Sequence, residues 1–345
     1  MHEARVLVVD DSAAMRALFS DILDQAKNVT VVGTANNAAD ARDQIAELKP
    51  NVITLDVEMP GMSGIEFLEE IMERDPLPVV MLSSLTQAGT ETSLRAFELG
   101  AVECFPKPLK ATPEQFAKQV GKLGKIVLAA ANSNVRDRKP RHAAAEQKPA
   151  EIAFNWNGRV VAISASMGGI EALMTMLAGF PANCPPIAVC LQAEPMVVEM
   201  FIRKLDDLLK CNVRAAVDGA ELTQGTIHIA ADPTRHVVME PGQPPRLRMM
   251  DRDPVDGARP SANLLFGSIA RATVPTVGVV LTGMGSDGAR GLRLLKESGC
   301  DTFVQDRKTA LVSEAPEAVI ALDAASREIA LIDLGAAVLG ACSIG

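Results

Sequence analysis

Short apolar runs alternate with amphipathic stretches along the first 130 residues of the chain. Five runs have the length and the apolar character of buried strands: RVLVVDD, VTVVGTA, NVITLDV, PVVMLSS and AVECFPKP. Residues 12–26 and 38–48 show helical periodicity, and a last helix is predicted over residues 113–131. Strand–helix alternation of this kind predicts a doubly wound parallel sheet.

The same alternation resumes at Arg159 and continues to the end of the chain. The predicted strands are RVVAISA, PPIAVCLQA, CNVRAAV, GTIHIAA, HVVME, PTVGVVLTG and CDTFVQD, with helices such as IEALMTMLAGF and ANLLFGSIARA between them. This pattern predicts a second, larger α/β domain with a doubly wound parallel sheet. We therefore expect one domain over residues 1–130, a basic flexible linker over residues 131–154 and a second domain over residues 155–345.

Composition narrows the class of protein. The 345 residues carry a formal net charge of −9, which argues against a general nucleic-acid-binding protein. No apolar run approaches the roughly 20 residues that a membrane-spanning helix needs, and the first residues lack a signal-peptide pattern. The six cysteines show neither CxxC pairs nor metal-ligand spacing, as expected of free thiols in a reducing compartment. We expect a cytoplasmic protein without membrane insertion.

Charged and hydroxyl side chains follow four strands of the first domain. Asp10 and Asp11 end the first strand, and Asp56 ends the third. Ser83 ends the fourth strand, and Lys107 follows the fifth. Parallel strands bring these positions to one edge of the sheet, where carboxylate oxygens suit Mg²⁺. With the metal and the ammonium neutralising charge, an aspartate there can attack a phosphoryl donor and hold an acyl phosphate.

The first 120 residues resemble a response-regulator receiver domain. The resemblance rests on VLVVDDS, ITLDVEMPGMSGIEFLEEI, VVMLSSLTQAGTETSLRAFELGAVE and the KP dipeptide. It implies a flavodoxin-like fold, with a histidine kinase of a chemotaxis-type pathway as phosphodonor. It also implies that Asp56 is the phosphorylation site and that Asp10, Asp11 and Asp56 hold Mg²⁺. Ser83 would be the switch hydroxyl, and Lys107 would contact the phosphoryl group.

Two small-residue loops carry candidate chemistry in the second domain. SASMGG places Ser166 at a sharp strand-to-helix turn, where Gly168 and Gly169 allow tight backbone bending. It matches the G-x-S-x-G pattern of hydrolases only in part, because Ser164 stands at the first glycine. TGMGSDGARG is a glycine-rich loop that holds Asp287. Such a loop allows the close backbone approach that an oxyanion site requires, although a tight turn with a capping aspartate has the same pattern.

Residues 155–340 resemble the catalytic domain of the chemotaxis protein-glutamate methylesterases. VAISASMGGIEAL, PIAVCLQAEPMVVEMFIRKLD, RPSANLLFGSIA and VGVVLTGMGSDGARGL occur in that family's order, after a receiver. The resemblance implies hydrolysis of glutamyl methyl esters, and deamidation of glutamines, on the cytoplasmic domains of methyl-accepting chemoreceptors. It places Ser166 at the nucleophile and Asp287 at the acid of a Ser-His-Asp triad. Met284 falls on the oxyanion loop.

The base of this triad is missing. The family has Gln-His where this chain has Gln192 and Ala193. Loss of the base costs a serine hydrolase roughly 10⁶ in kcat. His228, at a predicted strand end, and Glu194 are the candidate substitutes. Further departures from the family pattern are Cys104 for an aromatic residue in the receiver, and Met167, Asn263 and Glu314-Ala315-Pro316 around the second site.

Two hypotheses follow for the whole chain. In the first, phosphorylation of the receiver controls a hydrolase that acts on receptor methyl esters through Ser166. In the second, the chain is a pseudoenzyme that accepts phosphate as a sink, or binds receptors or a signalling partner, without hydrolysis.

Overall fold

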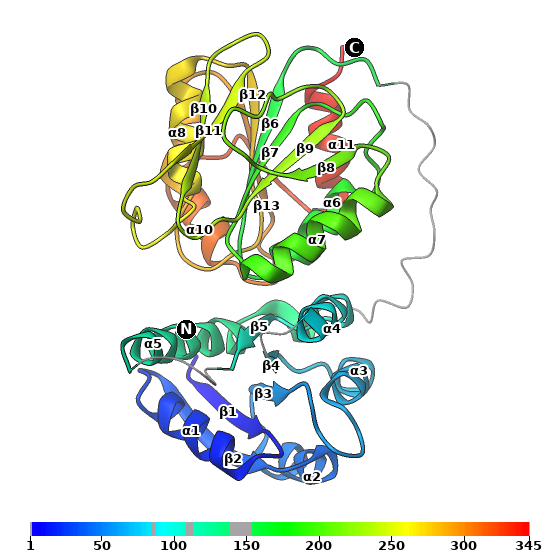
Figure 1. The fold of residues 1–345 in the computed structure, drawn as a ribbon, viewed down its shortest axis with the longest axis vertical. Coiled ribbons are helices and arrows are strands. Elements are labelled where there is room, and N and C mark those ends of the chain that lie inside the picture. Colours follow the sequence, from blue (N-terminus) through cyan, green and yellow to red (C-terminus); the bar gives the residue numbers. More distant parts are fainter. Residues whose placement is uncertain (1, 84–86, 108–112, 138–153, 345) are drawn as a thin grey trace. The chain divides into compact units, whose positions relative to one another are not determined.

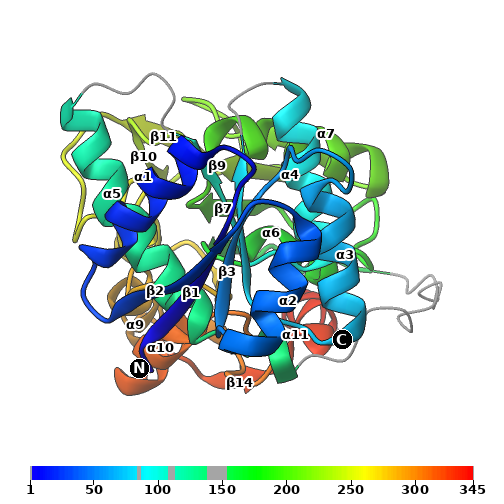
Figure 2. The ribbon, with the colours of Figure 1, turned by 90° about the horizontal axis from the view of Figure 1, so that it is seen from below.

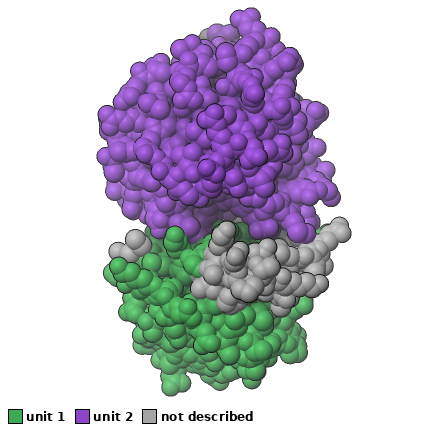
Figure 3. Space-filling view, turned by 60° about the vertical axis from the view of Figure 1, so that its left-hand side comes forward, with its two compact units in different colours: residues 1–143 green, residues 144–345 purple. Residues whose placement is uncertain are grey.

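The computed structural model describes residues 2–83, 87–107, 113–137 and 154–344. It divides into two units, residues 1–143 and 144–345, which are coloured green and purple in Figure 3. The predicted linker, residues 131–154, lies mostly outside the described residues. Its first part forms a 3₁₀ helix, η1 (Asn134–Asp137), in which Arg136 donates a hydrogen bond to the Pro50 carbonyl. This part of the segment therefore contacts the first unit.

The first unit is a five-stranded parallel sheet in the order β2-β1-β3-β4-β5. The strands are β1 (Ala4–Val9), β2 (Val29–Ala35), β3 (Val52–Asp56), β4 (Val79–Ser83) and β5 (Glu103–Pro106). The helices are α1 (Ala13–Asp24), α2 (Ala38–Leu48), α3 (Gly64–Arg74), α4 (Gln87–Leu99) and α5 (Pro113–Ala131). Helices α1 and α5 cover one face of the sheet, and α2, α3 and α4 cover the other (Figure 2). The predicted flavodoxin-like arrangement is confirmed.

Local sequence explains how these elements begin. The central strands β3 and β4 are buried along their whole length, as expected for a parallel sheet covered on both faces. Ser12 caps α1 by accepting a hydrogen bond from the Met15 N–H. Ser63 and Glu66 form a reciprocal capping box at the start of α3. The caps fix where each helix begins, and so hold the loops that follow β1 and β3 at the carboxyl edge of the sheet.

The second unit is built on a seven-stranded parallel sheet in the order β14-β13-β12-β6-β7-β9-β8 (Figure 1). Its strands are β6 (Val160–Ala165), β7 (Ile187–Leu191), β8 (Asn212–Ala215), β9 (Thr226–Ala230), β12 (Thr276–Val280), β13 (Asp301–Gln305) and β14 (Arg327–Ile329). Its helices are α6 (Gly169–Leu177), α7 (Pro195–Leu208), α8 (Ala262–Ala272), α9 (Ala289–Glu297), α10 (Glu314–Ala321) and α11 (Leu331–Ala341). Among the described residues, no helix combines the length and the apolar character that crossing a membrane requires.

The second unit departs from the predicted pattern at one hairpin and one edge. HVVME forms β10 (His236–Glu240), but it pairs antiparallel with β11 (Arg246–Met250) outside the main sheet and packs on α8. Neither β11 nor the three-residue β14 was predicted. In RLRMM the buried Leu247 lies between two exposed arginines, because only one face of this short strand is covered. The strand β14 is too short for a detectable period.

Candidate functional sites

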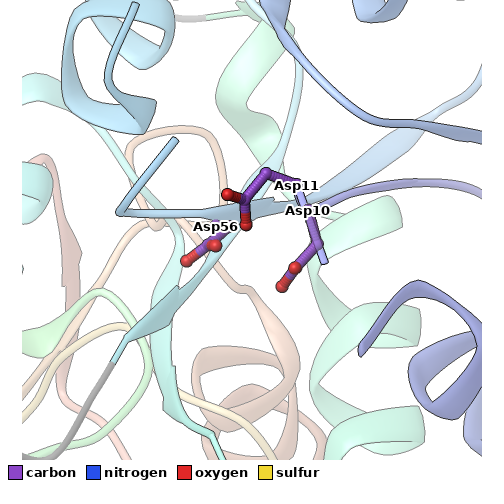
Figure 4. Close-up of side chains that lie close together, drawn as sticks. All are labelled: Asp10, Asp11 and Asp56. Atoms are coloured by element: carbon purple, nitrogen blue, oxygen red, sulfur yellow. The ribbon is translucent and has the colours of Figure 1, made fainter. Parts of the chain in front are cut away.

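Three carboxylates meet at the carboxyl edge of the first sheet. Asp10 and Asp11 follow β1, and Asp56 is the last residue of β3 (Figure 4). One oxygen of each side chain lies within 4.8 Å of the other two. Asp10 and Asp56 are buried and Asp11 is exposed, so that the cluster opens to solvent on one side. The arrangement predicted for these three residues is therefore present.

Lys107 joins this cluster from the end of β5. Its Nζ lies 2.9 Å from Asp10 Oδ2 and 2.7 Å from Asp56 Oδ1. Burial raises the pKa of Asp56, against the lowering effect of its hydrogen bond with Lys107. Burial acts to lower the pKa of Lys107, but the two carboxylates together outweigh it and leave this pKa raised. Three carboxylates and one ammonium leave a formal charge of −2 that a hard divalent cation such as Mg²⁺ fits.

Ser83 ends β4 and is linked, through Ser93, to a cysteine that the sequence did not connect with it. The Ser93 hydroxyl of α4 donates a hydrogen bond to Ser83 Oγ at 3.4 Å. The Cys104 thiol donates in turn to the Ser93 carbonyl at 3.7 Å. All three residues are buried, and burial raises the pKa of the Cys104 thiol. Ser93 thus connects the predicted switch hydroxyl to the cysteine at the family's aromatic position.

We expect Ser93→Ala to make phosphorylation of Asp56 easier. The Ser93–Ser83 bond must lengthen if Ser83 turns toward a phosphoryl group, and a bond of this kind contributes about 1 kcal/mol. The concentration of acetyl phosphate that gives half phosphorylation should fall about fivefold, measured on phosphate-affinity gels. Ser20→Ala, which removes another buried hydroxyl on α1, is the matched control. Equal midpoints for the two variants would contradict the expected role of Ser93.

Ser166 lies immediately after β6, facing the loop that follows β12. Its Oγ accepts a hydrogen bond from the Met284 N–H at 3.0 Å. Gly168 has a φ of +75° and begins the turn into α6. A β-carbon at Gly283 would overlap Ser166 Oγ, so that a larger residue there would displace the Ser166 side chain. The glycines predicted to permit close approach therefore bring the predicted nucleophile against the predicted oxyanion loop.

The Asp287 carboxylate is fully engaged by the start of α8. Its Oδ1 accepts hydrogen bonds from Ser261 Oγ (2.7 Å) and the Asn263 N–H (3.2 Å). Its Oδ2 accepts from the Ala262 N–H (2.7 Å) and from Gln192 Nε2 (2.8 Å). Since the first backbone N–H groups of a helix lack partners within it, Asp287 serves as the cap of α8 from a distant loop. Gln192 was not predicted to contact it.

His228 cannot supply the missing base. It is the third residue of β9 rather than a strand end, and it pairs with Ala188, which pairs with Ala162. Four residues and two strands thus separate it from Ser166, roughly 16 Å at about 3.3 Å per residue and 4.8 Å per strand. The side chain is buried, and burial lowers the pKa of its imidazole.

Glu194 is the residue that precedes α7, one position after Ala193. Within the described part of the chain, no carboxylate or imidazole hydrogen-bonds Ser166 Oγ, whose contact is the Met284 N–H. A carboxylate of ordinary pKa is in any case a poor base for a serine hydroxyl. The described hydrogen-bond partner of Ser166 Oγ is therefore a backbone donor and not a base.

The space beside Ser166 is small. A cavity of about 10 Å³ is lined by Ser166, Gln192, Met284, Asp287 and Ala315, among others. This volume accommodates about one water molecule. The predicted nucleophile, acid and oxyanion loop therefore line one small cavity.

Two family models match the chain. Residues 6–119 match the response regulator receiver domain, and residues 161–338 match the CheB methylesterase. The catalytic domain of the Thermotoga maritima CheB methylesterase covers 53% of the chain and 98% of its own length, with 26% identity and a TM-score of 0.51. The second unit therefore has the fold of that catalytic domain.

Similar proteins extend over nearly the whole chain. A protein-glutamate methylesterase/protein-glutamine glutaminase of Agrobacterium fabrum is 43% identical over 97% of this chain and 96% of its own length. A protein of the same description from Rhizobium etli is 41% identical over the same shares. The carboxylates around Lys107 and the contact of Ser166 with the Met284 loop agree with these matches. The chain therefore belongs to the chemotaxis response-regulator family of protein-glutamate methylesterases.

Proposed function

We propose that the chain is a phosphorylation-controlled regulator of chemoreceptor adaptation whose esterase-type unit hydrolyses its target very slowly. The first step is phosphorylation of Asp56 by a histidine kinase, with Asp10, Asp11 and Asp56 holding Mg²⁺. That ion would supply charge neutralisation for the incoming phosphoryl group. The ion pairs of Lys107 with Asp10 and Asp56 support this assignment, because they place its ammonium where phosphoryl charge arrives.

The second unit would bind glutamate or glutamine side chains of methyl-accepting chemoreceptors. This substrate class follows from the relatives' description as protein-glutamate methylesterase/protein-glutamine glutaminase. The observation that carries slow hydrolysis is the Asp287 carboxylate, whose oxygens accept four hydrogen bonds from Gln192 and the start of α8. A base at Ser166 would lack an orienting acid, and none of the described residues is a base that hydrogen-bonds Ser166 Oγ. Oxyanion stabilisation and substrate binding alone leave a rate about 10³–10⁴ times that of the uncatalysed reaction in water.

Methanol release from a methylated receptor cytoplasmic fragment tests this proposal. We expect the chain, phosphorylated with acetyl phosphate and Mg²⁺, to release methanol within about twofold of Ser166→Ala, because an unactivated hydroxyl contributes little. Binding of the same fragment, measured by calorimetry, should be equal for both proteins. Release well above the Ser166→Ala level would instead show a working hydrolase, and loss of fragment binding would exclude the receptor as target.

A further inference from the structure

Glu314 contacts the loop that faces Ser166. It is the first residue of α10, and its Oε2 accepts a hydrogen bond from the Gly285 N–H at 2.8 Å. The preceding N–H of the loop, that of Met284, donates to Ser166 Oγ at 3.0 Å. Two consecutive backbone donors are thus divided between the predicted nucleophile and a carboxylate of the same chain.

The backbone around Glu314 holds it in this place. The Gly283 N–H donates to the Val312 carbonyl at 3.1 Å, and the Ala315 N–H donates to the Gly283 carbonyl at 3.0 Å. Ala315 also lines the cavity beside Ser166. Because bonds on both sides of Glu314 tie its segment to the loop, the backbone holds Glu314 within hydrogen-bonding reach of the Gly285 N–H.

The loop has the geometry of an anion site. Gly285 has a φ of +80°, and successive N–H groups next to a left-handed residue form concavities that bind anions. Oxyanion holes use such donors, aimed at the charge that develops in the transition state. In this chain a resident carboxylate already occupies one donor and places a negative charge beside the position of that oxyanion.

We propose that Glu314 is a positioning residue. Its carboxylate occupies the Gly285 N–H of the loop that faces Ser166, and its negative charge disfavours a second anion on Ser166. The inference rests on the proposed esterase site, and it is independent of the missing base. Two like charges held on consecutive backbone donors near a protein surface repel enough to change an equilibrium by about tenfold. The family's reaction would thus be opposed at Glu314 even if a base were present.

Binding of propylboronic acid tests the inference without any need for turnover. The Ser166 Oγ forms a bond to boron and loses its proton to solvent, and boron becomes tetrahedral and negatively charged. Boron NMR separates the trigonal from the tetrahedral species. We expect Glu314→Gln to bind about tenfold more tightly than the unmodified chain, because the amide oxygen can still accept from Gly285 while the charge is gone.

Glu317→Gln is the matched control. It removes the same charge from the first turn of α10, but Glu317 accepts from Ser313 Oγ and does not contact the loop. Equal affinity of the two variants for propylboronic acid would overturn the inference. So would a result in which neither the unmodified chain nor either variant forms a tetrahedral boronate. Boronate binding that survives in Ser166→Ala would instead refute the assignment of Ser166, and with it the proposed function.

Discussion

Replacing Ala193 with histidine should raise methanol release from methylated receptor fragments about a hundredfold. The substitution restores an imidazole at the family's base position, next to Gln192. In a serine protease, loss of the base costs about 10⁶ in kcat, and loss of the orienting aspartate alone costs about 10⁴. Since Asp287 is engaged by four donors around α8, we expect recovery of the base without its orienting partner. The gain should therefore stop about 10⁴-fold below a complete triad, and about tenfold lower still where the charge of Glu314 opposes the oxyanion.

Ala193→Gln is the control for this experiment, because it adds a polar side chain of similar size without basicity. Release should rise only for the histidine variant, and Ser166→Ala in the same background should abolish the gain. The rate should also increase with pH as the imidazole loses its proton, since a general base acts in its neutral form. A recovery close to 10⁶ would mean that Asp287 leaves α8 to orient the imidazole, and no recovery would mean that the cleft itself is lost.

Asp287→Ala should destabilise the second unit by about 3 kcal/mol. The carboxylate caps α8 and satisfies Ser261, which is fully buried, so the variant leaves several donors without a partner. Loss of a cap costs about 1 kcal/mol, and each unsatisfied buried donor adds about 1–3 kcal/mol. For a domain of this size, the melting temperature in calorimetry should fall by about 6–12 °C.

An exposed aspartate provides the comparison for this measurement. Asp333 lies in the first turn of α11, and Asp333→Ala should leave the second unit's melting temperature within about 2 °C. Phosphorylation of Asp56 should be unaffected by either substitution. If the Asp287→Ala and Asp333→Ala variants melt at the same temperature, the hydrogen bonds around α8 do not stabilise the second unit. The presence of Asp287 must then be explained by a catalytic role alone.

Local patterns were sufficient to predict most of the fold. The apolar runs of the first unit correspond to its five strands, and the helix expected at 113–131 is α5 (Pro113–Ala131). Buried parallel strands have a strong signal because both of their faces are apolar. The β11 strand was missed because its exposure breaks that signal, and the position of His228 was misjudged because strand register depends on neighbours far along the chain.

The sequence predicted which residues form the candidate sites, but not the hydrogen bonds that connect them. Ser166 and Met284 were placed in one cleft by resemblance, and the structure brings them to hydrogen-bonding distance. The partners of Asp287 could not be read from the sequence, because Gln192 lies 95 positions away and Ser261 lies 26 positions away. Glu314 was recognised only as a departure from the family pattern. Its role depends on which N–H its carboxylate meets.

The capping of α8 by Asp287 affects the interpretation of sequences that keep the serine and the aspartate of this triad. Because this carboxylate caps α8, selection for a stable fold favours keeping it whether or not the chain hydrolyses esters. Serine and aspartate motifs then persist in lineages whose chemistry has ceased, and a motif search counts them as signs of activity. The residue at position 193, where this chain has alanine, is therefore more informative about a working triad than Asp287 is.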